Sequence, residues 1–252
     1  MEGLAGKNAL ITGAGGGIGA AIASRLDRAG VRVHVLDIDG VAAQARVAQL
    51  EHDGLALEVD IADYDAVAAA VNRLLTVEGS IDLLVNNAGW DHAAPFLDTT
   101  PGLWRKVVDI NYMGPIHVLH SVLPAMVVQG QGRVVNISSD AGRVGSTGEA
   151  VYAGCKAGVI ALGKSIAREL ARSGITINAV CPGPTDTALF AEFAGEGEFG
   201  DRVRRGLERA IPMRRLGQPE DLAGIVAFLL SDEARFVTGQ VVSVSGGLTM
   251  HG

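Results

Sequence analysis

The stretch ALITGAGGGIG, residues 9–19, decides the fold of this chain. An apolar run, a glycine-rich turn and the helix-like segment at 20–26 follow one another, which predicts a strand, a tight turn and a helix. Glycine permits positive φ and lets a diphosphate approach the backbone, while free N–H groups at a helix start attract anions. The stretch therefore predicts the dinucleotide-binding turn of a β-α-β unit. A loop that merely happens to be rich in glycine is the alternative.

A second predicted strand, residues 31–36, leads directly into Asp37. In a dinucleotide-binding unit, an acid at this place accepts hydrogen bonds from the ribose hydroxyls. The same carboxylate would repel the 2′-phosphate of NADP, and Gly16 supplies no cation to offset that repulsion. We therefore predict NAD as the cofactor.

Strand-like runs alternate with helical patterns along the whole chain. The runs lie at 8–12, 31–37, 55–59, 81–86, 132–138, 175–181 and 240–245. This alternation predicts one α/β domain over residues 1–252, built as a Rossmann-type, doubly wound parallel sheet of about seven strands. Helix starts are expected at Thr100-Pro101 and Gln218-Pro219, because proline suits a first helical turn.

The segment 184–217 is the one long region without a clear strand. Its phenylalanines, glycines and arginines are typical of a mobile lid over a site. A plain amphipathic helix pair with a solvated basic face is the alternative.

The composition excludes several classes of function. The 252 residues are 48% hydrophobic with a formal net charge of −7, which allows one sizeable core and argues against a general nucleic-acid or anionic-membrane binder. No apolar segment approaches the ~20 residues needed to span a bilayer, and the chain lacks a charged-then-apolar leader, so a cytoplasmic protein is expected. Cys155 and Cys181 sit in apolar patterns and are expected to be buried thiols. His117 and His120 lack a third ligand, so no metal site is expected.

Tyr152 and Lys156 stand four residues apart in the segment VYAGCK, residues 151–156. On a helix this spacing places a phenol and an ammonium group on one face. A fixed positive charge favours the phenolate, so the pair can serve as an acid or base near neutral pH. A half-exposed helix face is the alternative for the pair taken alone. Ser139 adds a hydroxyl thirteen residues before Tyr152, at a strand end where parallel sheets bind ligands.

These features occur together in an order that resembles the short-chain dehydrogenase/reductase family, from about Gly3 to the C-terminus. The resemblance is carried by the glycine turn, the NNAG segment at 86–89, Asn111, Ser139, Tyr152, Lys156 and the Pro-Gly pair at 182–183. It implies an enzyme that transfers a hydride between NAD and a secondary alcohol or ketone. A non-enzymatic dinucleotide sensor would keep the glycine turn and Asp37 but need not keep the other polar residues.

The resemblance implies a role for each member of the polar set. Tyr152 acts as general acid or base on the substrate oxygen, and Lys156 binds the nicotinamide ribose and stabilises the phenolate. Ser139 orients the substrate oxygen, and Asn111 holds a water in a proton relay. Strand alternation lets only one of Ser138 and Ser139 face the site, and the thirteen-residue interval to the tyrosine selects Ser139.

The resemblance also implies that the cofactor contacts the ends of several strands. Asp60 matches the acid that hydrogen-bonds the adenine edge, with a helix N-cap as its alternative. The asparagines at 86–87 are expected to tie down buried backbone. The expected cofactor-binding residues are Gly13, Gly16, Gly17, Ile18, Gly19, Asp37, Asp60, Ile61, Asn87, Ala88, Gly89, Tyr152, Lys156, Pro182, Gly183, Thr185 and Thr187.

The substrate is not set by fold and cofactor. The segments at 86–91, 139–146, 148–152 and 181–188 resemble family members that oxidise a cyclic 2-hydroxyacyl-CoA. Reductases of 3-oxoacyl thioesters and dehydrogenases of other secondary alcohols, including steroids, share the general motifs and are the alternatives. The candidate substrate residues are Trp90, Asp91, Arg143 and Glu149.

Arginines gather within the expected lid, at positions 202–214, in an otherwise acidic protein. Such local basic charge suits the phosphates of a CoA tail. Pairing with nearby glutamates on a solvated surface is the alternative.

The resemblance further implies a homotetramer. Family members usually pair the long helices that here span about 101–129 and 152–173, and they pack their C-terminal regions together. The apolar finish at 241–250 suits such a contact. Apart from further copies of the chain, a small-molecule substrate is the expected partner.

Overall fold

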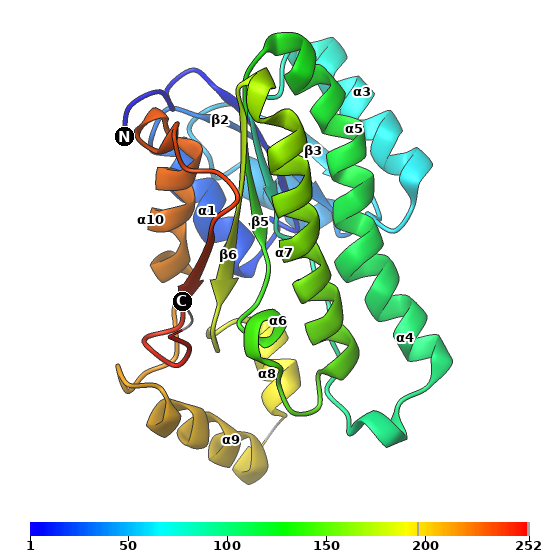
Figure 1. Ribbon diagram of the computed structural model, residues 1–252, viewed down its shortest axis with the longest axis vertical. Helices are drawn as coiled ribbons and strands as arrows, with labels where there is room; N and C mark the ends of the chain where they lie inside the picture. Colours follow the sequence, from blue (N-terminus) through cyan, green and yellow to red (C-terminus); the bar gives the residue numbers. More distant parts are fainter. Residues whose placement is uncertain (196, 251–252) are drawn as a thin grey trace.

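The apolar, β-branched runs form one parallel sheet in the computed structural model, which describes residues 1–195 and 197–250 (Figure 1). The strand order is β3-β2-β1-β4-β5-β6-β7, so the winding direction reverses between β1 and β4. Each strand was predicted from the sequence to within two residues at either end. The strands are β1 Asn8–Thr12, β2 Arg32–Asp37, β3 Ala56–Glu58, β4 Leu83–Asn86, β5 Gly132–Ile137, β6 Ile175–Pro182 and β7 Val241–Val244.

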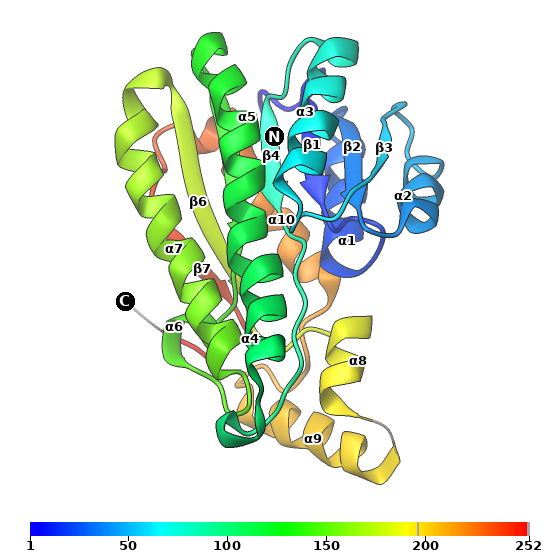
Figure 2. The same cartoon turned by 90° about the vertical axis from the view of Figure 1, so that its right-hand side faces the viewer.

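Helices cover both faces of the sheet (Figures 1 and 2). Adjacent residues of β1 point to opposite sides: Ile11 packs in a core with Ile22 and Val226, and Leu10 in a second core with Leu74. Burial on both faces explains why the strands are nearly continuous apolar runs. One face carries α1 Gly17–Asp27, α2 Gly40–Val47 and α10 Pro219–Leu230, and the other carries α3 Tyr64–Glu78, α5 Gly114–Gln129 and α7 Ala150–Leu170.

The predicted helix starts are confirmed. The Thr100 hydroxyl accepts from the Leu103 N–H at 3.3 Å, and Pro101 lies in the first turn of α4 Pro101–Val108. Gln218 and Asp221 form a reciprocal cap at the start of α10. The expected helix at 101–129 is divided by a π-helical turn, Asp109–Met113, between α4 and α5.

Four helices gather at the carboxyl end of the sheet, at the bottom of Figure 1: α4, α6 Ala141–Val144, α8 Ala188–Ala194 and α9 Gly197–Ala210. The expected lid therefore contains two helices, which agrees with the helix-pair alternative. Phe190, Ile211 and Leu216 form a small apolar cluster there, apart from both main cores. Residue Glu196 and the side chains of Phe193 and Phe199, also expected in the lid, lie outside the described part of the chain.

Helix α7 lies beside α5 on its face of the sheet, with α3 on the other side of α5 (Figure 2). By length and hydropathy alone, Ala150–Ser173 is the one segment of the described residues that could cross a membrane. It packs against β6 and α6 and buries the ammonium group of Lys156. Cys155 and Cys181 are buried free thiols, as predicted.

His34 lies in the middle of β2 and has no solvent exposure. Its Nδ1 accepts from the Leu55 N–H at 3.1 Å, and its Nε2 has no partner among the described residues. Burial lowers the pKa of His34 to about 4, from 6.5. The unfolded chain therefore takes up a proton on this residue at a higher pH than the folded chain does.

We expect His34 to make the fold sensitive to acid. Its stabilising contribution is complete above pH 6.5 and is lost as the pH falls toward 4, by about 3 kcal/mol in total. Urea unfolding of wild type and His34→Gln at pH 7.5 and 4.5 measures this, and His92→Gln, at an exposed position, is the control. If His34→Gln loses as much stability between the two pH values as wild type and the control, this account of His34 is wrong.

Candidate active site

The glycine turn holds the end of β1 against the end of β4. Gly13 has φ +64, and a Cβ there would lie 2.7 Å from the Cα of Ala88. A Cβ on Gly19 would lie 2.4 Å from the carbonyl oxygen of Gly13. The Asn87 amide donates to the carbonyls of Thr12 at 3.0 Å and Gly13 at 2.8 Å. The predicted backbone-tying role of Asn87 is thus visible, and side chains on these glycines would force the two strand ends apart.

The start of α1 is open to an anion. Gly16 is the N-cap, without a side-chain cap, and a Cβ there would meet nothing within 4 Å. Gly17 has φ +54 and faces Thr187, whose methyl would lie 3.7 Å from an added Cβ. Thr187 in turn caps α8 through the Phe190 N–H at 3.1 Å. Free N–H groups bordered by a threonine fit the diphosphate of a dinucleotide.

The loop after β6 reaches this turn from the other end of the sequence. Pro182 ends β6, and the Gly183 N–H bonds Val244 at 3.0 Å. Thr185 is buried, and its hydroxyl donates to the Gly183 carbonyl at 2.9 Å. The predicted cofactor residues at 182–187 and 13–19 are therefore brought together.

Asp37 ends β2 beside the same turn. Its Oδ2 accepts from the Gly15 N–H at 2.8 Å, and its Oδ1 accepts from the Asp39 N–H at 3.1 Å. Each carboxylate oxygen retains a further lone pair. The group is fixed in place and still able to accept from ribose hydroxyls.

Three other predicted cofactor residues have structural contacts of their own. Asp60 accepts from the Ala62 N–H at 2.9 Å, while Asp63 caps α3, so the N-cap alternative for Asp60 is wrong. Ile18 packs against the first core and Ile61 lies in the second. Ile61 is buried, so its backbone is the part left for a cofactor, whereas Ile18 is only partly buried.

Tyr152 and Lys156 face the crevice from α7, with the Lys156 Nζ 5.5 Å from the centre of the tyrosine ring. Nζ donates to the Ile137 carbonyl at 3.1 Å, and burial lowers the pKa of Lys156 to about 8. Burial raises the pKa of Tyr152, as do the charges of Glu149 and Asp91, whereas a hydrogen bond with Ser139 lowers it. In the free protein these effects outweigh the expected help from Lys156, and the phenol keeps its proton.

The two serines at the end of β5 point in different directions. The Ser138 hydroxyl is buried and donates to the Lys156 carbonyl at 2.8 Å, so it holds α7 against the strand. Ser139 lies beside Tyr152, and its oxygen also accepts from the Ala141 N–H at 3.1 Å. The structure thus places Ser139, as expected, on the side of the tyrosine.

Asn111 is fully buried in the π-helical turn. Its amide donates to the carbonyls of Trp90 at 2.6 Å and Val107 at 2.9 Å, and its Oδ1 accepts from the Trp90 N–H at 3.2 Å. A Cβ on Gly89 would lie 3.0 Å from this oxygen and 3.3 Å from the Lys156 Nζ. Asn111 therefore fixes the loop after β4 close to the lysine. This hydrogen-bonded structural role is the alternative to the relay role that the resemblance implies.

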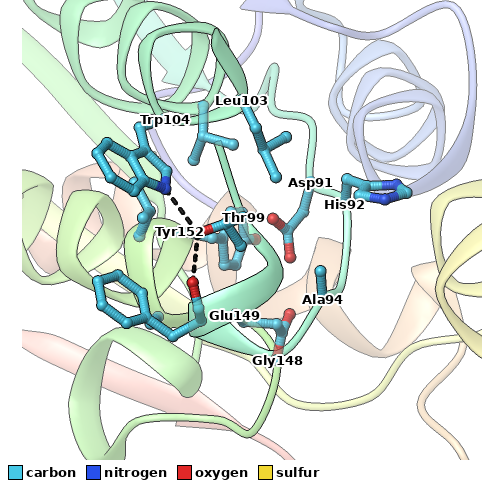
Figure 3. A pocket seen from close by; sticks show the side chains of 13 residues that line it. Asp91, His92, Ala94, Thr99, Leu103, Trp104, Gly148, Glu149 and Tyr152 are labelled. Atoms are coloured by element: carbon cyan, nitrogen blue, oxygen red, sulfur yellow. Dashed lines mark hydrogen bonds between the residues drawn. The ribbon is translucent and has the colours of Figure 1, made fainter. Parts of the chain in front are cut away.

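A pocket of about 280 Å³, counted with its open mouth, lies against Tyr152 (Figure 3). Of the four predicted substrate residues, Asp91 and Glu149 line it. The other two residues make contacts elsewhere. The Lys106 ammonium lies over Trp90, 3.7 Å from the centre of the indole ring. Arg143 donates to the Ser243 hydroxyl at 2.9 Å. The other lining residues are His92, Ala94, Phe96, Thr99, Leu103, Trp104, Val107, Gly148, Ala150 and Val151.

Aromatic residues after β4 form a wall of the pocket that the sequence analysis did not predict. The Phe96 and Trp104 rings are stacked with centres 6.2 Å apart. The Trp104 Nε1 donates to the Thr99 hydroxyl at 2.7 Å, which donates to the Phe96 carbonyl, as the dashed lines in Figure 3 show. The one available signal was position, because loops at strand ends beside a switch point bind ligands.

Comparison with known proteins agrees with this geometry. A family profile described as Enoyl-(Acyl carrier protein) reductase matches residues 13–249. The 3-oxoacyl-[acyl-carrier-protein] reductase of Staphylococcus aureus is 39% identical over 97% of this chain and 98% of its own. The oxidoreductase UcpA of Escherichia coli is 40% identical over 99% and 97%.

Two solved structures have the same fold. Levodione reductase superposes with a TM-score of 0.94 at 33% identity, covering 96% of this chain and 97% of its own. The 3-ketoacyl-(acyl-carrier-protein) reductase of Brucella melitensis, complexed with NADH, gives 0.92 at 32% identity and covers 98% and 100%.

Fold and site together define an oxidoreductase that uses a nicotinamide cofactor on CH–OH or keto groups. The chain belongs to the short-chain dehydrogenase/reductase family.

Proposed function

We propose that the protein interconverts a β-oxoacyl thioester and the corresponding β-hydroxyacyl thioester with NAD(H). The pocket against Tyr152 carries this proposal. Its apolar wall suits an acyl group, and at its polar end the Tyr152 phenol lies beside the Ser139 hydroxyl. The relatives that reduce 3-oxoacyl and 3-ketoacyl thioesters of acyl carrier protein support the thioester.

The proposed mechanism uses four residues of the chain. In reduction, Tyr152 donates its proton to the ketone oxygen while Ser139 hydrogen-bonds the same oxygen. Lys156 would bind the nicotinamide ribose, and Asn111 keeps the loop after β4 in place. When bound, the nicotinamide exchanges a hydride with the carbon of the substrate. The residues fix where the proton and the hydride move, and that fixed geometry lowers the barrier.

We propose NAD over NADP as the cofactor. Asp37 stands fixed at the end of β2, and no cation accompanies it at Gly16. A 2′-phosphate beside this carboxylate would be repelled. The NADH complex of a relative supports a nicotinamide cofactor of either kind.

Two acyl groups are candidates. A linear 3-oxoacyl group is favoured by the relatives. A cyclic one, as in 2-hydroxycyclohexanecarboxyl-CoA, is favoured by the resemblance of residues 86–91 and 148–152, and Asp91 and Glu149 from these segments do line the pocket. Both substrates place the reacting carbon in the same β position relative to the thioester carbonyl.

Side-by-side assays separate the candidates. We expect NADH oxidation, followed at 340 nm, with 3-oxobutanoyl-CoA and 2-oxocyclohexanecarboxyl-CoA to exceed that with simple cyclic ketones by at least tenfold in kcat/KM. The better of the two thioesters identifies the acyl group. Equal or better turnover of the simple ketones would overturn the thioester proposal.

The carrier of the acyl group is proposed to be CoA. In α9, Arg204 pairs with Asp186 at 2.8 Å, which accounts for one of the arginines. Arg202, Arg205 and Arg209 are exposed and share one face of α9 at spacings of three and four residues. This stripe of arginines supports binding of the CoA phosphates. We also propose that α8 and α9 together close over the pocket as a lid.

We also propose a cytoplasmic homotetramer. The edge strand β7 is only partly buried along its length, and Phe236 just before it is fully exposed. Met250, after the strand, is 82% exposed. An exposed apolar edge of this kind favours pairing with a second copy. Light scattering measures the assembly directly.

A further inference from the structure

The pocket contains two acidic side chains that the proposed reaction does not use. Asp91 comes from the loop after β4, and Glu149 is the N-cap residue of α7. Figure 3 shows both side chains at the pocket that Tyr152 borders. Glu149 precedes Tyr152 by three residues, so the two lie on one face of the helix start.

The two loops that carry this pair are fixed to each other. The Ala94 N–H donates to the Gly148 carbonyl at 3.0 Å, and Gly148 has φ +83. Trp90 directly precedes Asp91. The Asn111 side chain accepts from the Trp90 N–H and donates to the Trp90 carbonyl, which fixes this part of the loop. The pair is therefore part of the built wall of the pocket.

The Asp91 and Glu149 carboxyl groups lie close enough to influence each other's pKa. Burial raises the pKa of both, and the charge of Asp91 raises that of Glu149 further. The interaction itself lowers the pKa of Asp91 and raises that of Glu149, so it favours the ionised form of Asp91 and the protonated form of Glu149. The Asp91 Oδ2 is buried and has no hydrogen-bond partner in the described chain. A negative charge with spare accepting capacity thus stands in the pocket wall.

We propose that Asp91 and Glu149 determine specificity by admitting an acyl group whose carboxyl is esterified and excluding the free carboxylate. This inference rests on the proposed function. The carboxylate of a free β-oxo acid would lie two carbons from the carbon whose oxygen meets Tyr152, and so close to Glu149 and Asp91. Two negative charges at roughly 5 Å in a partly buried site weaken binding on the order of 10²-fold. A thioester carries no charge at that place.

Three β-oxo compounds test the pair: 3-oxobutanoyl-CoA, methyl 3-oxobutanoate and free 3-oxobutanoate. We expect wild type to use the methyl ester at least 30-fold better than the acid in kcat/KM. Asp91→Asn removes the charge and should lower the ester-to-acid ratio of kcat/KM about tenfold or more. Glu149→Gln replaces a protonated carboxyl by a neutral amide, so it should leave that ratio within threefold of wild type. Asp98→Asn removes an exposed acid from the same loop, outside the pocket lining, and should not change the ratio.

The comparison separates this proposal from the proposed function. Equal use of ester and acid by wild type, or an unchanged ester-to-acid ratio in Asp91→Asn, would overturn specificity by the pair. The thioester function predicts that wild type has a higher kcat/KM for 3-oxobutanoyl-CoA than for the methyl ester. If the two values are equal while the ester is still used better than the acid, that result would count against the thioester function alone. An enzyme that reduces none of the three compounds would overturn both.

The pH profile gives a second readout that a merely structural role would not move. The titratable groups facing the pair are Tyr152, Cys155 and Lys156 on α7, and His92 on the loop after β4. Negative charge on Asp91 raises the pKa of Tyr152. We expect Asp91→Asn to shift the rising limb of alcohol oxidation to lower pH, because the phenolate then forms more easily. If the pH profile of Asp91→Asn is not shifted, the charge of Asp91 does not act on Tyr152 as proposed.

Discussion

Tyr152→Phe is expected to lower kcat by about 10²–10⁴ in both directions, because general acid–base catalysis contributes this much and the phenol oxygen is the group that moves the proton. Phenylalanine keeps the ring beside Lys156, so the cofactor site should be intact. NADH binding, measured by fluorescence titration, should stay within a few fold of wild type.

Tyr64→Phe is the matched control. It removes an exposed hydroxyl that is hydrogen-bonded to the His120 Nδ1 at 3.0 Å. Tyr64 does not line the pocket. We expect its kcat to be unchanged. Near-normal kcat in Tyr152→Phe would contradict the assignment of Tyr152 as the general acid or base. A loss of kcat in Tyr64→Phe equal to that in Tyr152→Phe would indicate damage to the fold.

Asp37→Ser is expected to change the preference for NAD over NADP by about 10²-fold, measured as the ratio of kcat/KM values. The carboxylate that repels a 2′-phosphate is removed, and a serine can still bond a ribose or a phosphate oxygen. Adding Gly16→Arg should increase NADP use further. Gly16 has an extended backbone, which an arginine can adopt, and open space around its Cβ position.

Asp39→Asn is the control for this change. Asp39 is an exposed acid two residues away that caps α2 through the Ala42 N–H at 3.0 Å, and asparagine is also a good cap. Its cofactor ratio should remain that of wild type. Comparable kcat/KM for NAD and NADP in the wild-type protein would remove the basis of the prediction.

The sheet could be predicted because each strand is an apolar run between clear breaks. Leu10 and Ile11 show why: both faces of β1 are buried, so the run is continuous and easily seen. The glycine turn was equally visible, since the φ of +64 at Gly13 favours glycine and a Cβ there would lie only 2.7 Å from the Ala88 Cα.

Side-chain contacts between distant segments could not be predicted. The sequence does not show that Arg143 reaches Ser243, one hundred residues on, or that Asn111 binds Trp90. The expected effect of Lys156 on Tyr152 was incomplete for the same reason. Helix spacing brings a cation near the phenol, but the burial of the phenol and the nearby acids Asp91 and Glu149 depend on tertiary packing.

The region after β6 was assigned least well. Helix α9 has an amphipathic pattern, but α8 and α9 bury only a small cluster around Phe190, so the pattern fits both a helix pair and a lid. The aromatic wall of the pocket was missed because Phe96 lies in a three-residue 3₁₀ turn and Trp104 in the short helix α4. Periodicity does not show that these two rings stack against each other.

The central claim is that this site passes a hydride between nicotinamide and a carbon bearing oxygen, with Tyr152 supplying the proton. Deuterium transfer from [4-²H]NADH to 3-oxobutanoyl-CoA and 2-oxocyclohexanecarboxyl-CoA, analysed by mass spectrometry and NMR, measures that step directly. The account predicts one deuterium on the carbinol carbon of the product with wild type, and transfer at least a hundredfold slower with Tyr152→Phe. Tight NADH binding with no deuterium in either product, or equal transfer by the two proteins, would contradict it.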